Sequence, residues 1–238
     1  MAGYAYQWLN PWQKSHIFYM RFVYTTKRIN ADIRGNNYVV VVYTDMAGDT
    51  EVKLRDRGKE MMVDRNFLDV FCEDFELFFK NRKNTMRALE LQCEWQSDSE
   101  ENINFQRVEV IRNRLSRFFE NLLKSEAKPP KLKNIYMDTN DSEQALRIIR
   151  SLNPKALMRI FLKFSCANAE ISEILSLKDW NKGHRSKVVI RLQKLTSENW
   201  DTLKNIREDL EGCYIRIDPD QWPCSDQRYV DYKENDSD

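Results

Sequence analysis

A short apolar phrase recurs along this chain, and its spacing restricts the folds that the chain can adopt. The phrase has apolar residues at its first, fourth and sixth positions, and its central residue returns at intervals of about 25 to 46 residues. The full form occurs at Met86–Leu91, Leu132–Met137 and Leu157–Leu162, and a shortened form occurs at Ile190–Leu192 and Ile215–Ile217. Such phrases every 20–30 residues are typical of a solenoid in which each repeat adds one strand to a shared sheet. Solenoids usually hold other macromolecules.

Segments between the phrases predict helices that alternate with the strands. Tyr38–Tyr43 is β-branched and aromatic, and with Val52 and Leu54 it predicts a hairpin that opens the sheet. Apolar stripes with helical spacing lie at Phe67–Phe78, Val108–Leu122, Leu146–Leu152, Ile171–Trp180 and Trp200–Leu210. Strands that alternate with helices of this length are expected to be parallel, because a parallel pair needs a long crossover.

The fold class predicted from these patterns is α/β. We expect a degenerate leucine-rich-repeat-like solenoid, with a mostly parallel sheet and helices packed on one side. Asn140 follows Leu132–Met137 at the spacing at which leucine-rich repeats carry an asparagine. Coincidence explains this single match equally well, because the other repeats carry Glu94, Ser165 or Leu195 there.

Composition narrows the functional classes. The net charge of +1 from 38 basic and 37 acidic residues argues against a dedicated nucleic-acid binder. The five cysteines are scattered, without a C-x-x-C pair, which indicates reduced thiols in an intracellular protein. The sequence shows neither a signal peptide nor an apolar run of transmembrane length. We therefore expect a soluble protein of the cytoplasm, with the nucleus as the alternative.

From about Tyr38 to Ile217 the chain resembles the FTH domain family of nematode F-box proteins. The resemblance is strongest from Leu146 to Glu211, where Leu152-Asn-Pro-Lys and Ala156-Leu-Met-Arg-Ile are similar to one family passage. Ile171-Ser-Glu-Ile, followed by Leu177-Lys-Asp-Trp180, is similar to the family's helix that ends in a Glu-Gln-Trp phrase, although Lys178 and Asp179 depart from it. In that family, an F-box usually docks on the Skp-type adaptor of a cullin ubiquitin ligase. The FTH domain is then expected to bind the protein to be ubiquitinated.

The resemblance and the patterns together predict three parts. Residues 1–37 are expected to form a helical segment, the remnant of an F-box that is truncated or decayed. In it, Met20–Ile29 resembles the late F-box phrase that leads into a basic helix. Residues 38–217 would form the FTH-like α/β repeat domain. Residues 218–238 are rich in acidic residues and are expected to be a mobile tail.

No assembled set of catalytic, metal-binding or cofactor-binding residues is evident, so we expect neither an enzyme nor a cofactor. The two histidines, His16 and His184, are far apart in the sequence, and none of the common phosphate-binding or zinc-protease motifs occurs. The acidic pairs Glu73-Asp74 and Glu100-Glu101 have the character of solvated surface.

The binding surface is expected on the exposed face of the sheet, because residues between the apolar positions of a strand point to the other face. The candidate protein-binding residues are Arg87, Glu90, Tyr136, Phe161, Lys163, Arg191 and Arg216. Arginine and aromatic residues are enriched at protein interfaces.

The function predicted is a protein–protein interaction module, the substrate-recruiting part of an F-box-type ubiquitin ligase adaptor. Its expected partners are a target protein and the Skp-type adaptor. In this interpretation the protein binds neither a membrane nor a nucleic acid. One alternative is a free-standing binding solenoid. Another is a nucleic-acid-associated binder that uses the basic stretch 106–133, although a solvated helix face explains those charges as well.

Overall fold

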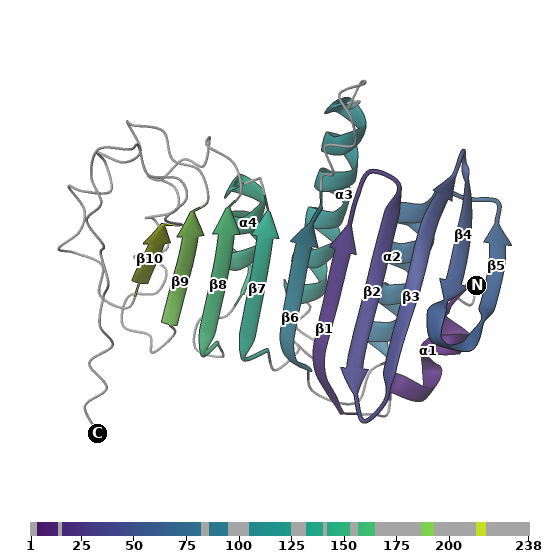
Figure 1. Ribbon diagram of the computed structural model, residues 1–238, viewed down its shortest axis with the longest axis horizontal. Coiled ribbons are helices and arrows are strands. Elements are labelled where there is room, and N and C mark those ends of the chain that lie inside the picture. Colours follow the sequence, from purple (N-terminus) through teal and green to yellow (C-terminus); the bar gives the residue numbers. More distant parts are fainter. Residues whose placement is uncertain are drawn as a thin grey trace.

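The chain folds around one ten-stranded sheet that is open at both ends (Figure 1). The computed structural model describes residues 4–13, 16–81, 86–94, 105–124, 132–139, 142–152, 157–164, 187–192 and 213–217. The strand order across the sheet is β10-β9-β8-β7-β6-β1-β2-β3-β4-β5. The strands are β1 (Ile17–Tyr24), β2 (Arg28–Gly35), β3 (Tyr38–Met46), β4 (Asp49–Leu54), β5 (Lys59–Val63), β6 (Met86–Cys93), β7 (Asn134–Thr139), β8 (Arg159–Phe164), β9 (Lys187–Leu192) and β10 (Cys213–Ile217).

The half of the sheet that contains β6 to β10 is parallel. Each of these strands pairs with the next one along the chain, and β6 also pairs in parallel with β1. All five recurring phrases overlap these strands, so the predicted mixed α/β fold with one strand per phrase is confirmed. The long interval between the first two phrases contains the crossover helix from β6 to β7.

The other half of the sheet is an antiparallel meander, so the expectation of a mostly parallel sheet is wrong for this half. Strands β1 to β5 pair in sequence order, each antiparallel to its neighbour. The predicted hairpin is β3–β4, and the Asp45 side chain accepts a hydrogen bond from the backbone N–H of Gly48 in its turn. Short connections allow antiparallel pairing, whereas parallel pairing requires a crossover.

The N-terminal residues differ most from the sequence prediction. Residues 1–37 were expected to be helical, but the described part contains one short helix and then β1 and β2. Strand β1 lies inside the sheet between β2 and β6, and it contains the start of the phrase that resembles a late F-box helix. From Tyr19 to Phe22, half-buried and buried residues alternate with the period of a strand. Residues 17–35 are therefore part of the same sheet as the FTH-like region.

Helices cover one face of the sheet among the described residues (Figure 1). They are α1 (Tyr6–Gln13), α2 (Phe67–Lys80), α3 (Phe105–Lys124) and α4 (Ser142–Arg150). Helix α2 begins at the predicted phenylalanine stripe, and the Asn66 side chain caps it by accepting a hydrogen bond from the N–H of Leu68. The helical stripe predicted at Val108–Leu122 lies in α3 and most of the stripe predicted at Leu146–Leu152 lies in α4, so these two predictions are confirmed. The opposite face of β1, β2, β6 and β7 carries no described helix.

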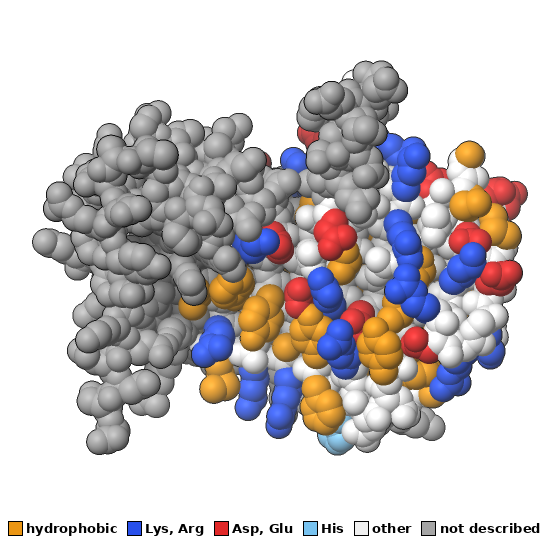
Figure 2. Space-filling model, viewed as in Figure 1, with side chains coloured by type: hydrophobic (Ala, Val, Ile, Leu, Met, Phe, Trp, Pro, Cys, Tyr) orange, Lys and Arg blue, Asp and Glu red, His pale blue; other side chains and the backbone are white. Residues whose placement is uncertain are grey.

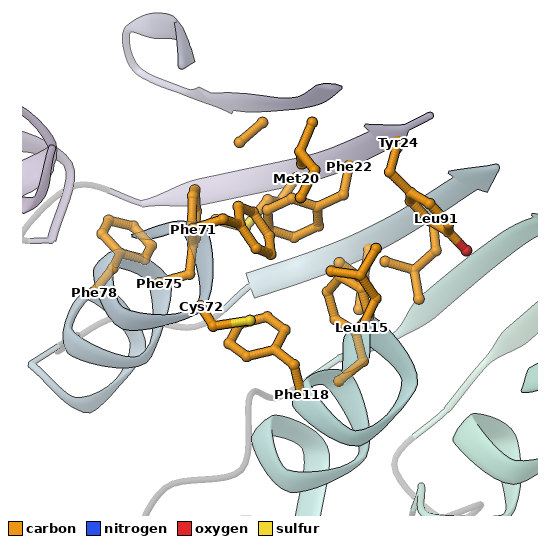
Figure 3. Close-up of a cluster of buried hydrophobic side chains, with 14 of the residues drawn as sticks. Met20, Phe22, Tyr24, Phe71, Cys72, Phe75, Phe78, Leu91, Leu115 and Phe118 are labelled. Atoms are coloured by element: carbon orange, nitrogen blue, oxygen red, sulfur yellow. The ribbon is translucent and has the colours of Figure 1, made fainter. Parts of the chain in front are cut away.

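An aromatic cluster forms the centre of the core between β1, α2 and α3 (Figure 3). Phe22 of β1 is fully buried, and its ring centroid lies 5.0 Å from Phe75 and 5.5 Å from Phe71, edge to face in both cases. Phe119 of α3 lies 5.4 Å from the same ring. Through these contacts the core packs the meander against α3, the crossover helix between β6 and β7.

Several sequence predictions fall outside the described residues. They are Asn140, the helical stripes of 171–180 and 200–210, and the acidic tail 218–238. Within the described part of the chain, none of the helices has the length and apolar character required to cross a membrane.

Candidate functional site

The face of the sheet that lies opposite the helices carries two adjacent rows of candidate residues. Strand register places Arg21, Glu90, Tyr136, Phe161 and Val189 side by side across β1, β6, β7, β8 and β9. Two residues further along each strand, a second row contains Gln92, Asp138, Lys163, Arg191 and Arg216. We call these the Glu90 row and the Lys163 row, and the surface they form the open face.

Six of the seven predicted binding residues belong to these two rows. Glu90, Tyr136 and Phe161 are neighbours in one, and Lys163, Arg191 and Arg216 are neighbours in the other. Arg87 does not join them: it is exposed at the start of β6, two residues before the buried Leu89. Alternation along a strand gives Arg87 the parity of Leu89, which packs on the helix side. Arg87 therefore lies outside the two rows, and its role in binding stays a prediction.

The described side chains of the rows are partly accessible. Glu90 and Lys163 are each 25% exposed, and Tyr136 and Phe161 are half-buried. The rings of Tyr136 and Phe161 lie 6.1 Å apart, centroid to centroid, on adjacent strands. Figure 2 shows this face, where charged side chains alternate with hydrophobic ones over the middle of the sheet. The side chains of Arg191 and Arg216 are not among the described ones.

Charges at the junction of β1 and β6 neutralise one another. The Arg21 guanidinium lies 3.2 Å from a carboxylate oxygen of Glu90 and also donates a hydrogen bond to Gln92. Tyr19 donates its hydroxyl to Glu90. Burial, the hydrogen bond to Glu90 and the negative charge of Glu90 raise the pKa of Tyr19 well above its usual value. Tyr19 is therefore a neutral donor that holds the Glu90 carboxylate in place.

A second neutralised cluster extends the open face onto β2 and β3. Arg34 donates to both carboxylate oxygens of Asp32, at 3.3 Å and 2.9 Å. Its guanidinium carbon also lies 5.2 Å from the ring centroid of Tyr19 and 5.6 Å from that of Tyr38. A guanidinium over an aromatic ring is stabilised by the ring quadrupole. This part of the face presents aromatic surface with its charges already paired.

Sequence reasoning did not identify Tyr19, Arg21, Asp32 or Arg34 as members of this surface. All four lie in the segment that was expected to be a helical F-box remnant. The signals that could have identified them are the β-branched and aromatic run of Ile17–Tyr24 and the alternation of polar and apolar residues in Arg28–Ile33.

The basic stretch on α3 is partly neutralised by neighbouring elements. Arg107 pairs with Asp45 of the β3–β4 hairpin and donates to the carbonyl of Thr26. Arg114 lies 2.5 Å from a carboxylate oxygen of Asp69 on α2. These two basic residues therefore serve helix packing, which reduces the charge available to a phosphate backbone.

The Glu73-Asp74 pair was expected to be solvated surface, and this expectation is wrong for Asp74. The carboxylate of Asp74 is fully buried, and it accepts hydrogen bonds from the N–H of Ala5 at 2.9 Å and the N–H of Tyr6 at 3.1 Å. The Tyr43 hydroxyl donates a third hydrogen bond, at 3.0 Å. Burial raises the pKa of Asp74 to about 6, although the three hydrogen bonds act in the opposite direction. Glu73, by contrast, forms an ion pair with Arg65.

The described residues do not bring together three or more of the side chains that commonly bind metal ions. Cys72 and Cys93 are buried free thiols, and burial raises the pKa of Cys72 to about 12. A thiol with such a pKa is a poor nucleophile at neutral pH.

Comparison with known proteins supplies one match. Residues 113–205 match the family model of the FTH domain, a range that begins within α3 and includes β7, α4, β8 and β9. The matched range is narrower than residues 38–217, over which the sequence resemblance was noted. Searches of curated proteins and of solved structures found no match. Residues 113–205 of the chain are therefore similar to the FTH domain.

Proposed function

We propose that this protein is a protein-interaction module that binds a target protein on the open face of its sheet. The observation that supports this most directly is the alignment of six candidate residues in two adjacent register rows. A role in protein interaction also fits the FTH domain. Half-buried aromatic side chains beside charged ones are the composition that protein interfaces favour.

The finer proposal is that the module recruits substrates to an F-box-type ubiquitin ligase. It rests on the family match alone, because residues 17–35 form strands of the sheet instead of F-box helices. Any contact with a Skp-type adaptor must then use a surface of the folded domain or residues outside the described part. The leucine-rich-repeat-like character of the parallel half is likewise a proposal, based on five consecutive parallel strands in sequence order.

Affinity purification of the full-length chain from its own cells tests both levels of the proposal. Deleting residues 1–37 is unsuitable, because the deletion would remove β1 from between β2 and β6. The informative variant is the double substitution Tyr136→Ala and Phe161→Ala, which removes the aromatic pair of the open face. Its control is Val110→Ser, which alters an exposed apolar residue of α3. Each protein recovered is then assayed for direct binding with purified components.

We expect at least one target protein to bind the wild type and the Val110→Ser variant and to be lost from the double variant. Recovery of a Skp-type adaptor and a cullin with all three proteins would support the ligase role. A target without these two proteins would leave a free-standing binding module. If every bound protein is retained by the double variant, the open face is not the binding surface.

A further inference from the structure

We propose that the edge of the sheet at which β6, β7 and β8 begin binds the surface of an anionic phospholipid membrane. This inference is independent of the open face and goes beyond the proposed function. It follows from a group of exposed basic and apolar side chains that the strands bring together at this edge. We call this group, which consists of Phe18, Arg87, Lys133, Met158 and Arg159, the basic edge.

Backbone pairing holds the residues of the basic edge side by side. The N–H of Lys133 donates to the carbonyl of Arg87 at 2.9 Å, and the N–H of Met158 donates to the carbonyl of Lys133 at 2.7 Å. Phe18 lies beside Arg87, because the residues on either side of Phe18 pair with those on either side of Arg87. Adjacent strands are about 4.8 Å apart, so the group extends over about 14 Å across β1, β6, β7 and β8.

The three bases of the basic edge are exposed, and none of them is ion-paired with a described carboxylate. On the open face, by contrast, Arg21 and Lys163 each contact a carboxylate. The segments 81–89, 127–137 and 152–165, in which β6, β7 and β8 begin, each contain three basic residues and no acidic residue. The basic edge therefore presents positive charge to an anionic surface.

Two apolar side chains lie at the ends of the group. Met158 is 60% exposed, and Phe18 is 47% exposed. Exposed apolar side chains beside bases are typical of surfaces that bind membranes, because the bases attract anionic headgroups while the apolar groups enter the interface. A contact of this kind needs no membrane-spanning segment.

The position of the group at a border of the described structure favours a flat partner. Figure 2 shows basic and hydrophobic side chains side by side along the lower margin of the described face. Binding sites for small molecules are concave, whereas a plane can touch all the residues of an edge at once. A nucleic acid would use the bases but would gain little from Phe18 and Met158, since most of its affinity comes from a series of phosphate contacts.

Co-flotation of the full-length chain with lipid vesicles tests this inference. The vesicles consist of phosphatidylcholine alone or of phosphatidylcholine and phosphatidylserine at about three to one. The variants are Lys133→Glu and Met158→Ala. Each has a matched control at the opposite edge of the sheet: Lys27→Glu in the turn after β1, and Met46→Ala at the end of β3, where the side chain is 48% exposed. Circular dichroism melting verifies that each variant is folded, and Lys133→Gln replaces the charge reversal if that variant unfolds.

We expect the wild type to bind the vesicles that contain phosphatidylserine and to bind phosphatidylcholine alone at least about tenfold more weakly. Lys133→Glu should weaken binding by about tenfold, because it changes the charge at the surface by two. Met158→Ala should weaken binding by about threefold, because it removes apolar area from the contact. Neither control should change binding by more than about twofold, because both lie beyond the range of the surface potential.

No binding to the phosphatidylserine vesicles, or an equal loss in the Lys27→Glu and Lys133→Glu variants, overturns the inference. Fluorescence anisotropy with a labelled oligothymidylate and with a labelled peptide of repeated Glu-Glu-Phe units covers the other anionic partners. Tighter binding of either probe that is lost in Lys133→Glu would assign the edge to a nucleic acid or to an acidic protein instead. The double variant Tyr136→Ala and Phe161→Ala should bind the vesicles as the wild type does, and a loss there would place the lipid contact on the open face and refute this inference alone.

Discussion

The carboxylate of Asp74 on α2 accepts a hydrogen bond from the backbone N–H of Ala5, so a buried charge fixes the start of α1 to the second helix. The first N–H groups of a helix lack partners within the helix, and a carboxylate there is also favoured by the helix dipole. Tyr43 of β3 donates to the same carboxylate. One side chain thereby joins the N-terminal helix, the meander and α2.

Replacing Asp74 with Asn is expected to change how stability depends on pH. The folded protein holds the proton of Asp74 up to a pKa of about 6, against an ordinary value of 3.8. Between these values the folded state binds more protons than the unfolded state, so the wild type loses stability as pH rises through this window. Its free energy of unfolding, taken relative to the Asn variant, should fall by on the order of 3 kcal/mol.

Urea unfolding of both proteins at a series of pH values between about 4 and 7 measures this difference. Because Asn does not titrate, subtracting the two curves removes the contributions of all groups whose environments are unchanged. A constant difference across the series would show that the pKa of Asp74 is not raised.

Tyr43→Phe is expected to destabilise the protein by about 1–3 kcal/mol, because it removes one of three donors from a buried carboxylate. The control is Tyr38→Phe, which removes a hydroxyl from a half-exposed ring on the same strand and should cost less than about 0.5 kcal/mol. Urea denaturation at neutral pH gives both values. Equal effects of the two substitutions would argue against the hydrogen bond to Asp74.

Phe22→Ala should lower the free energy of unfolding by about 3–5 kcal/mol, because it leaves a cavity against three other phenylalanine rings. Phe18→Ala removes the same side chain from the same strand where it is 47% exposed, and it should cost less than about 1 kcal/mol. Thermal and urea unfolding of the two variants provide the comparison. A mild effect of Phe22→Ala would mean that β1 is not part of the central core.

Gly35→Ala should destabilise the junction of β1 and β2 by about 1–3 kcal/mol. A Cβ atom at this position would lie 2.4 Å from the backbone carbonyl oxygen of His16, which cannot move without disturbing the strand pairing. The exposed neighbour Asn36 supplies the control substitution, Asn36→Ala, for which we expect little change. Hydrogen exchange of the β1 and β2 amides, measured together with unfolding, should show faster exchange in the Gly35 variant alone. Unchanged exchange would mean that the strands accommodate the added methyl group.

Local patterns in the sequence were sufficient to predict the parallel half and most of its candidate surface. The recurring phrase marks β6 to β10, and the phenylalanine stripe marks α2, because strand and helix periods are properties of a few consecutive residues. Alternation within the phrase likewise placed Glu90, Tyr136 and Phe161 together, since equivalent positions of parallel strands come into register. The FTH resemblance was also visible in the sequence itself.

Only the tertiary structure decided which distant segments meet. Strand β1, which the sequence placed in an F-box remnant, pairs with both β2 and β6 and so lies in the middle of the sheet. Tyr19 and Arg21 of β1 therefore belong to the open face. The burial of Asp74 depends on α1 and on Tyr43, which are distant from it in the sequence. Strand order and the burial of a polar group are set by long-range packing and by the requirement that buried polar groups find partners. Neither is contained in the periodicity of a single segment.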